Sequence, residues 1–213
     1  MLPVSAETER KEMVILMNKN YWKSSALALK STQNLVLCAV FLALLIVMRM
    51  HLTFYVGTIR VTFEFLMYAL AGLFFGPVTG IFFGAAADLL GFLANGGGFS
   101  LQIGYTFVAM LRGFLFGLLL YRGAFNTQTK PLHIVRIILA KVTDTLIINI
   151  LINPFFRALY GTDTFWVNFS GTFVTGLIKN LIMLPVEILL LIAVVRIVEK
   201  NRKYLRFGRS RQA

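Results

Sequence analysis

The sequence has few of the residues from which soluble catalytic and metal-binding sites are built. Its 213 residues include one cysteine, Cys38, two histidines, His51 and His133, and only nine acidic residues. A lone cysteine excludes a disulfide framework and a cysteine-based metal site within the chain, and each histidine stands apart from other metal ligands. We therefore expect no metal ion and no cofactor.

Motifs for nucleotide binding and nucleophilic catalysis are also missing. The chain has no G-x-x-x-x-G-K-[ST] loop and no dinucleotide-binding glycine pattern, so it cannot energise transport with ATP by itself. It has neither H-E-x-x-H nor G-x-S-x-G, which argues against a zinc protease and an elbow-type serine hydrolase. Because an enzyme needs a nucleophile with a base, or a metal cluster, we expect this chain not to be an enzyme.

Charged residues are scarce, and apolar residues take their place. Only 14% of the residues are charged, whereas soluble domains carry about 25%. Apolar residues make up 58% of the chain, and the mean hydropathy is +0.77. Such an excess needs lipid as its solvent. No linker-like stretch interrupts the apolar part, so we predict one membrane domain (34–197) between an N-terminal tail (1–33) and a basic C-terminal tail (198–213). The Met13–Leu29 stretch of the first tail is expected to lie on the bilayer surface.

The apolar residues fall into six segments, which we compare with the roughly 20 residues that cross a bilayer core. This pattern predicts an all-α integral membrane bundle of six transmembrane helices. The second and third segments meet at Gly76-Pro77, where the missing proline N–H predicts a sharp turn. The segments are 34–50, 61–75, 77–94, 101–121, 134–156 and 169–197.

The positive charge is unevenly placed along the chain. A net charge of +12 is compatible with nucleic-acid binding, but five Lys/Arg lie in residues 1–33 and seven in residues 196–211. With the N-terminus inside, the inner segments hold fifteen Lys/Arg and the outer loops three. By the positive-inside rule, both termini are expected in the cytoplasm, with the tails facing phospholipid rather than nucleic acid.

Small residues recur at four-residue spacing on two predicted helices. Ala39 and Ala43 share one face of the first, and a ridge of glycines lies at 72, 76, 80 and 84. Small residues let helix backbones approach closely in lipid, so we expect the glycine ridge to pack helices inside the bundle. The alanine face has two interpretations that the residues leave open, namely internal packing or docking of a partner protein.

Ionisable and amide side chains occur inside the predicted spans. A charge at the bilayer centre costs a few kcal/mol unless it is paired or hydrated, so such residues face the bundle interior and are candidates for function. One interpretation is that Lys141–Asp144 and Arg112–Asp88 are structural pairs; the other is that the excess of cations binds an anionic ligand. The residues are Glu64, Asp88, Arg112, Lys141, Asp144, Lys179 and Glu187, with Asn149, Asn153 and Asn180 beside them.

The chain resembles a known family over roughly residues 33–198. Ala39-x3-Ala43, the stretch from Gly57 to Phe63, and Gly72-Leu73-Phe74-Phe75-Gly76-Pro77-Val78-Thr79-Gly80 followed by Asp88-Leu89-Leu90-Gly91 are similar to the substrate-binding S components of energy-coupling factor (ECF) transporters, which import vitamins into bacteria. Residues 176–187 and 153–161 look most like the folate-specific branch.

The resemblance implies a subunit of the bacterial plasma membrane that captures a vitamin from outside. It also implies docking, through Ala39 and Ala43, on a transmembrane coupling subunit that carries two ATPases. Three alternatives stay open: an S component for another vitamin such as pantothenate, a stand-alone secondary transporter, and a membrane enzyme or assembly factor. A stand-alone carrier would usually show an internal repeat with broken helices at matching positions, and we find none.

Folate combines a flat pterin ring, whose edge suits a carboxylate or an asparagine, with a dianionic glutamate that suits Arg or Lys. We expect the pterin edge to meet Asp88 or Asp144 together with Asn149. The predicted remainder of the site has three parts: the stacking rings Phe63, Phe99 and Tyr105, the cations Arg60 and Arg112 at the carboxylates, and Lys179 and Asn180 on the wall or floor.

Overall fold

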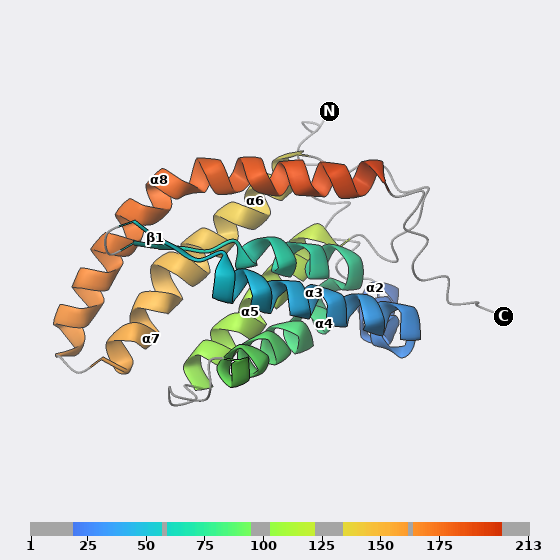
Figure 1. Ribbon diagram of the computed structural model, residues 1–213, viewed down its shortest axis with the longest axis horizontal. Coiled ribbons are helices and arrows are strands. Elements are labelled where there is room, and N and C mark those ends of the chain that lie inside the picture. The colour runs from blue at the N-terminus through green and yellow to red at the C-terminus, as the bar shows by residue number, and fades with distance from the viewer. Residues whose placement is uncertain (1–18, 57–58, 95–102, 122–133, 162–163, 202–213) are drawn as a thin grey trace.

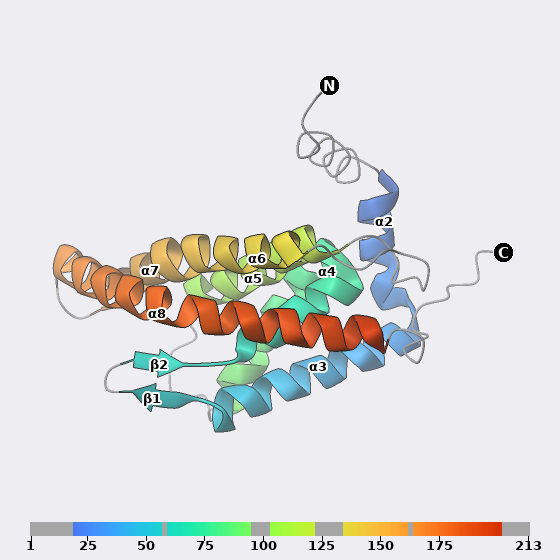
Figure 2. The same ribbon diagram turned by 90° about the horizontal axis from the view of Figure 1, so that it is seen from above.

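The computed structural model describes residues 19–56, 59–94, 103–121, 134–161 and 164–201. Helices account for nearly all of this part of the chain, as Figures 1 and 2 show. In chain order the elements are α2 (Lys19–Leu27), the 3₁₀ turn η1 (Ala28–Lys30), α3 (Thr32–His51), β1 (Phe54–Val56), β2 (Ile59–Val61), α4 (Glu64–Ala94), α5 (Ile103–Leu120), α6 (Ile134–Thr143), the π-helical segment η2 (Asp144–Ile152), α7 (Asn153–Leu159) and α8 (Phe165–Lys200).

Each predicted apolar segment forms a helix. Within the described ranges, α3, α4, α5 and α8 are long and apolar enough to cross a membrane. α4 is broken at Gly76, whose φ of 84° and ψ of −173° are not helical, so its two arms correspond to the second and third segments. α6, η2 and α7 follow one another without a gap and cover the fifth segment. The prediction of a helical membrane bundle is confirmed.

A short β-hairpin between α3 and α4 is an addition to the predicted all-α fold. β1 and β2 pair antiparallel, with Phe54 opposite Val61 and Val56 opposite Ile59. The hairpin projects from the ends of α3 and α4, below α8 in the view of Figure 2. Three-residue strands are too short to show the alternation by which a strand is recognised in a sequence, which explains why the prediction missed them.

α4 forms the centre of the bundle. Of its apolar window, 83% is buried, against 17% for α3 and for α8. The predicted glycine ridge packs α4 directly on the backbone of α5, because Gly72 faces Gly117, Gly80 faces Gly113 and Gly84 faces Ala109. A Cβ atom added at Gly72 would lie only 2.6 Å from the amide nitrogen of Gly117. The close approach of these two helices therefore depends on glycine.

The N-terminal helix α2 is anchored on the bundle at the break in α4. Ser25 is fully buried there, and its Oγ donates to the Phe75 carbonyl (2.9 Å) and accepts from the Val78 N–H (3.0 Å). The structure describes the predicted surface segment Met13–Leu29 only from residue 19 onward. One side of this part packs against the bundle. Ser25 binds at this point because Gly76 and Pro77 interrupt the helical hydrogen bonds of α4. The interruption leaves polar backbone groups that the Ser25 hydroxyl satisfies.

Candidate ligand-binding site

A cavity of about 580 Å³ lies among the start of α4, α5, η2, α7 and α8. Its volume is within the range of about 300–1,000 Å³ that is usual for small-molecule sites. Most of the lining is polar, although the surrounding helices are apolar. The lining residues are Thr62, Glu64, Tyr105, Arg112, Asn149, Asn153, Pro154, Arg157, Gly171, Thr172, Thr175, Gly176, Lys179 and Asn180.

Arg112 of α5 is held in the cavity wall by two residues of the π-helical segment. Its Nε donates to Asp144 Oδ1 (3.0 Å), and its Nη2 donates to Asn149 Oδ1 (2.8 Å). A π-helix closes hydrogen bonds between residues five apart, which brings Asp144 and Asn149 closer to one face than an α-helix would. The local backbone of η2 therefore decides that both side chains reach the same guanidinium group.

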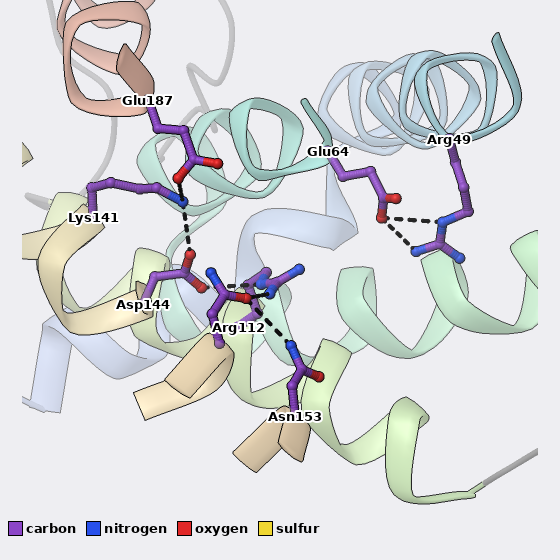
Figure 3. A network of polar contacts seen from close by, with 8 residues as sticks. Arg49, Glu64, Arg112, Lys141, Asp144, Asn153 and Glu187 are labelled. Carbon is purple, nitrogen blue, oxygen red and sulfur yellow. Dashed lines mark hydrogen bonds and ion pairs between the residues drawn. The ribbon is translucent and has the colours of Figure 1, made fainter. Parts of the chain in front are cut away.

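Behind Arg112, a chain of alternating charges runs from α5 to α8 (Figure 3). Lys141 Nζ forms an ion pair with Oδ2 of the fully buried Asp144 at 3.1 Å. The same Nζ atom lies 3.0 Å from Glu187 Oε2. Lys141 also lies 4.1 Å above the ring centre of Phe65. The predicted pair of Lys141 with Asp144 is confirmed, and the chain joins three separately predicted helices.

A second ion pair borders the cavity at the start of α4. Arg49 of α3 donates from Nε (3.1 Å) and Nη2 (2.8 Å) to the same oxygen of Glu64, as Figure 3 shows. Its Nη1 also donates to the Ala87 carbonyl at 3.3 Å. Arg49 is thus held against α4, where it neutralises the acidic side chain of the lining.

The lining carries a net positive charge. It contains the basic residues Arg112, Arg157 and Lys179 and one acidic residue, Glu64. Arg112 and Glu64 each form an ion pair with a residue outside the lining, Asp144 and Arg49 respectively. The cavity is therefore suited to an anion.

Tyr105 brings an aromatic ring into the lining of the cavity, and two further rings form a cluster with it. The ring of Tyr105, which is half-buried, lies 6.1 Å from that of Tyr160 between centres. Phe156 and Tyr160 stack at 6.3 Å with an angle of 16° between their planes. The Tyr160 hydroxyl accepts a hydrogen bond from the Gly104 N–H (3.2 Å), which ties α7 to the start of α5. A planar ligand in the cavity would find the ring of Tyr105 to stack on.

The structure brings half of the predicted substrate-binding residues together in this cavity. Asp144 lies directly behind its wall, where it holds Arg112. Phe63 packs against the hydrophobic core with its ring edge-on to Phe54, at 6.3 Å between centres. Phe99 lies outside the described residues, and Arg60 is described only as part of strand β2. The predicted residues that line the cavity are Tyr105, Arg112, Asn149, Lys179 and Asn180.

The predicted pairing of Arg112 with Asp88 is wrong. Arg112 contacts Asp144 and Asn149, whereas Asp88 accepts a hydrogen bond from Thr106 Oγ1 at 2.6 Å. The position of a residue along its helix does not determine how that helix is rotated about its axis, so the sequence did not reveal the partner of Arg112. Asp88 is also absent from the lining of the cavity.

Nine of the lining residues were not predicted to belong to the site. Two of them, Glu64 and Asn153, had been recognised only as polar residues at membrane depth. A signal for four others is visible in the sequence of α8, where small and polar residues recur at four-residue spacing and continue into Lys179 and Asn180. Those four are Gly171, Thr172, Thr175 and Gly176, and Thr62, Pro154 and Arg157 complete the set.

Helices that bury a polar, positively charged cavity among apolar spans define a membrane protein that binds a small anionic molecule. Residues 33–195 match the family described as "ECF transporter, substrate-specific component". Since this match covers most of the chain, the protein belongs to that family.

The chain is similar to two curated proteins called "Folate transporter FolT". With the one from Leuconostoc mesenteroides it shares 28% identity over 74% of this chain and 81% of the relative. With the one from Clostridium novyi it shares 25% identity over 81% of this chain and 93% of the relative. A solved structure, "Crystal structure of FolT bound with folic acid", matches with a TM-score of 0.65 and 26% identity, covering 78% of this chain and 94% of that one.

Proposed function

We propose that this chain is the folate-binding S component of an ECF-type importer and has no enzymatic activity of its own. The observation that carries the proposal is the cavity, whose net positive charge and adjacent rings fit a molecule with a flat heterocycle and two carboxylates. The similarity to proteins named as folate transporters, and to a structure named for bound folic acid, supports the same ligand.

Within this proposal, Arg157 and Lys179, two basic residues of the lining, bind the glutamate carboxylates. Asp144 acts through Arg112 and not by touching the ligand, because it is fully buried behind the wall. Arg60 and Phe99 stay predicted contacts of the ligand. Residues proposed to touch folate are Tyr105, Arg112, Asn149, Asn153, Arg157, Lys179 and Asn180.

The proposed partners are a transmembrane coupling subunit and its two ATPases. Ala39 and Ala43 are both exposed on α3, beside the exposed side chains of Val36, Val40 and Leu44. Exposure of both alanines favours the docking interpretation over packing inside this chain. We further propose a multi-pass location in the bacterial plasma membrane, with both termini in the cytoplasm, on the basis of the distribution of Lys and Arg.

Calorimetry on the purified, detergent-solubilised chain tests the ligand. Folate is expected to bind far more tightly than pantothenate, riboflavin, thiamine or biotin, because only folate offers both a pterin and a dianion. Tighter binding of pantothenate, the alternative anionic vitamin, would replace folate as the substrate and leave the family unchanged.

A further inference from the structure

The orientation of one amide in the cavity wall is determined by its neighbours. Asn149 Oδ1 accepts from Arg112 Nη2 (2.8 Å) and from Asn153 Nδ2 (3.3 Å). A guanidinium group carries only donors, so the atom of Asn149 that faces it must be the oxygen. The amide cannot turn over without placing its NH₂ group against those of Arg112 and Asn153.

This arrangement leaves the NH₂ group of Asn149 for a ligand. Asn149 lines the cavity, and among the described residues both hydrogen bonds of its side chain are accepted by Oδ1 and neither uses Nδ2. At this point the wall therefore offers a donor from Asn149 beside the donors of Arg112. The complementary ligand atom is a hydrogen-bond acceptor.

Arg112 and Asn149 form one corner of the cavity. The net charge of this corner indicates which kind of hydrogen-bond acceptor binds there. Asp144, whose side chain is 1% exposed, already neutralises Arg112 at 3.0 Å. The other basic residues of the lining are Arg157 and Lys179. Because Arg112 is already neutralised, a neutral carbonyl is better matched to the corner of Arg112 and Asn149 than an ionised carboxylate is.

We propose that Asn149 is a specificity-determining residue that recognises the 4-oxo group of the pterin ring by donating a hydrogen bond to it. This inference rests on the proposed function. Arg112 and Asn153 position the Asn149 amide. Because a site built to donate a hydrogen bond disfavours a ligand that presents a donor at the same place, the cavity discriminates against 4-amino analogues of folate. Aminopterin, which has a 4-amino group in place of the 4-oxo group and keeps the glutamate, is the matched probe.

The experiment measures the dissociation constants of folate and aminopterin for the purified chain and for Asn149→Asp. An ionised aspartate has the shape of asparagine but only accepts hydrogen bonds. We expect the wild-type chain to prefer folate. We expect Asn149→Asp to weaken folate by about ten-fold or more and to lower the ratio of aminopterin to folate dissociation constants by at least about ten-fold, as for the loss of one well-placed hydrogen bond.

Asn180→Asp is the matched control, since it adds the same charge to the same cavity. Asn180 already donates its Nδ2 hydrogen to the Gly176 carbonyl of its own helix (2.8 Å), so it has no comparable role in reading the ring. This variant should weaken both ligands by the same factor and leave their ratio unchanged. If Asn149→Asp does not fold, Asn149→Leu supplies the test, because it also removes the donor and should also lower the ratio.

Three outcomes would overturn proposals. An unchanged ratio in both Asn149 variants would show that Asn149 does not read the ring. Pteroate, which lacks the glutamate, should lose affinity in Asn149→Asp as folate does; if it does not, the corner holds the glutamate instead. Absence of folate binding by the wild-type chain would overturn the proposed function before any variant is compared.

Discussion

The side chain of Ser25 fills the space that a side chain at Gly76 would occupy. A Cβ atom at Gly76 would lie 2.7 Å from Ser25 Oγ and 2.8 Å from Tyr121 Cδ1, and the φ of Gly76 is +84°. The N-terminal helix α2 thus closes the break between the two arms of α4. The described part of the predicted N-terminal tail, from residue 19 onward, is therefore a structural part of the bundle.

Ser25→Ala is expected to destabilise the chain without changing ligand affinity. The variant leaves the Phe75 carbonyl and the Val78 N–H without their partner, at a cost of about 1–3 kcal/mol for each buried group that stays unsatisfied. The thermal unfolding midpoint in detergent should fall. Gly171→Ala is the control, because an added Cβ there meets nothing within 4 Å. An equal midpoint for Ser25→Ala and the wild type would mean that α2 does not stabilise the bundle.

Arg112→Ala should weaken folate binding by roughly ten- to a hundred-fold. The estimate corresponds to the loss of a charge-assisted hydrogen bond of about 1.5–3 kcal/mol. Because the variant also leaves the buried Asp144 with Lys141 as its remaining ion-pair partner, the unfolding midpoint must be measured beside the affinity. Undiminished folate binding by a folded variant would remove Arg112 from the site.

The ion pairs behind the cavity should show strong coupling between Lys141 and Glu187. Removing one member of a buried pair costs about 3–5 kcal/mol, whereas replacing both by apolar residues can be neutral. We expect Lys141→Met to unfold at a much lower temperature than the wild type and Lys141→Met/Glu187→Leu to regain part of the loss. Additive effects of the two single substitutions would contradict the coupling, since contacting residues are not independent.

Bulky residues on the exposed alanine face should block uptake and spare binding. Ala39→Trp/Ala43→Trp is expected to abolish folate uptake by cells that carry the coupling module, while the purified variant keeps the wild-type affinity. Leu181→Trp/Leu189→Trp places the same bulk on α8, where both leucines are exposed, and should leave uptake intact. Equal loss of binding and uptake in the alanine variant would mean that this face packs within the bundle.

Cysteine labelling tests the orientation of the chain in the membrane. In a Cys38→Ser background, a cysteine at Gly97 should react with a membrane-impermeant reagent in intact cells, and one at Thr127 should not. Both positions lie outside the described residues and follow from the fifteen-to-three distribution of Lys and Arg. The opposite labelling pattern would place the termini outside.

The sequence predicted some features of the site and missed others for identifiable reasons. Lys141 and Asp144 are three residues apart on one helix, so their pairing follows from helical geometry. The glycine ridge was also recognisable, because only small residues permit such close packing. The pairing of Arg112 with Asp144 was not predicted, since it joins α5 to the π-helical segment across 32 positions.

Apolar runs and the Gly76-Pro77 break by themselves determined that this is a helical membrane protein and where its helices lie. Lipid allows few backbone structures, and helical hydrogen bonds are local, so the chain's own order of residues suffices. Only the tertiary structure decided which buried charges neutralise one another, and that Arg157 and Lys179 line the same cavity as Arg112. These depend on how each helix is rotated and how closely it approaches its neighbours, which is set by packing between residues far apart in sequence.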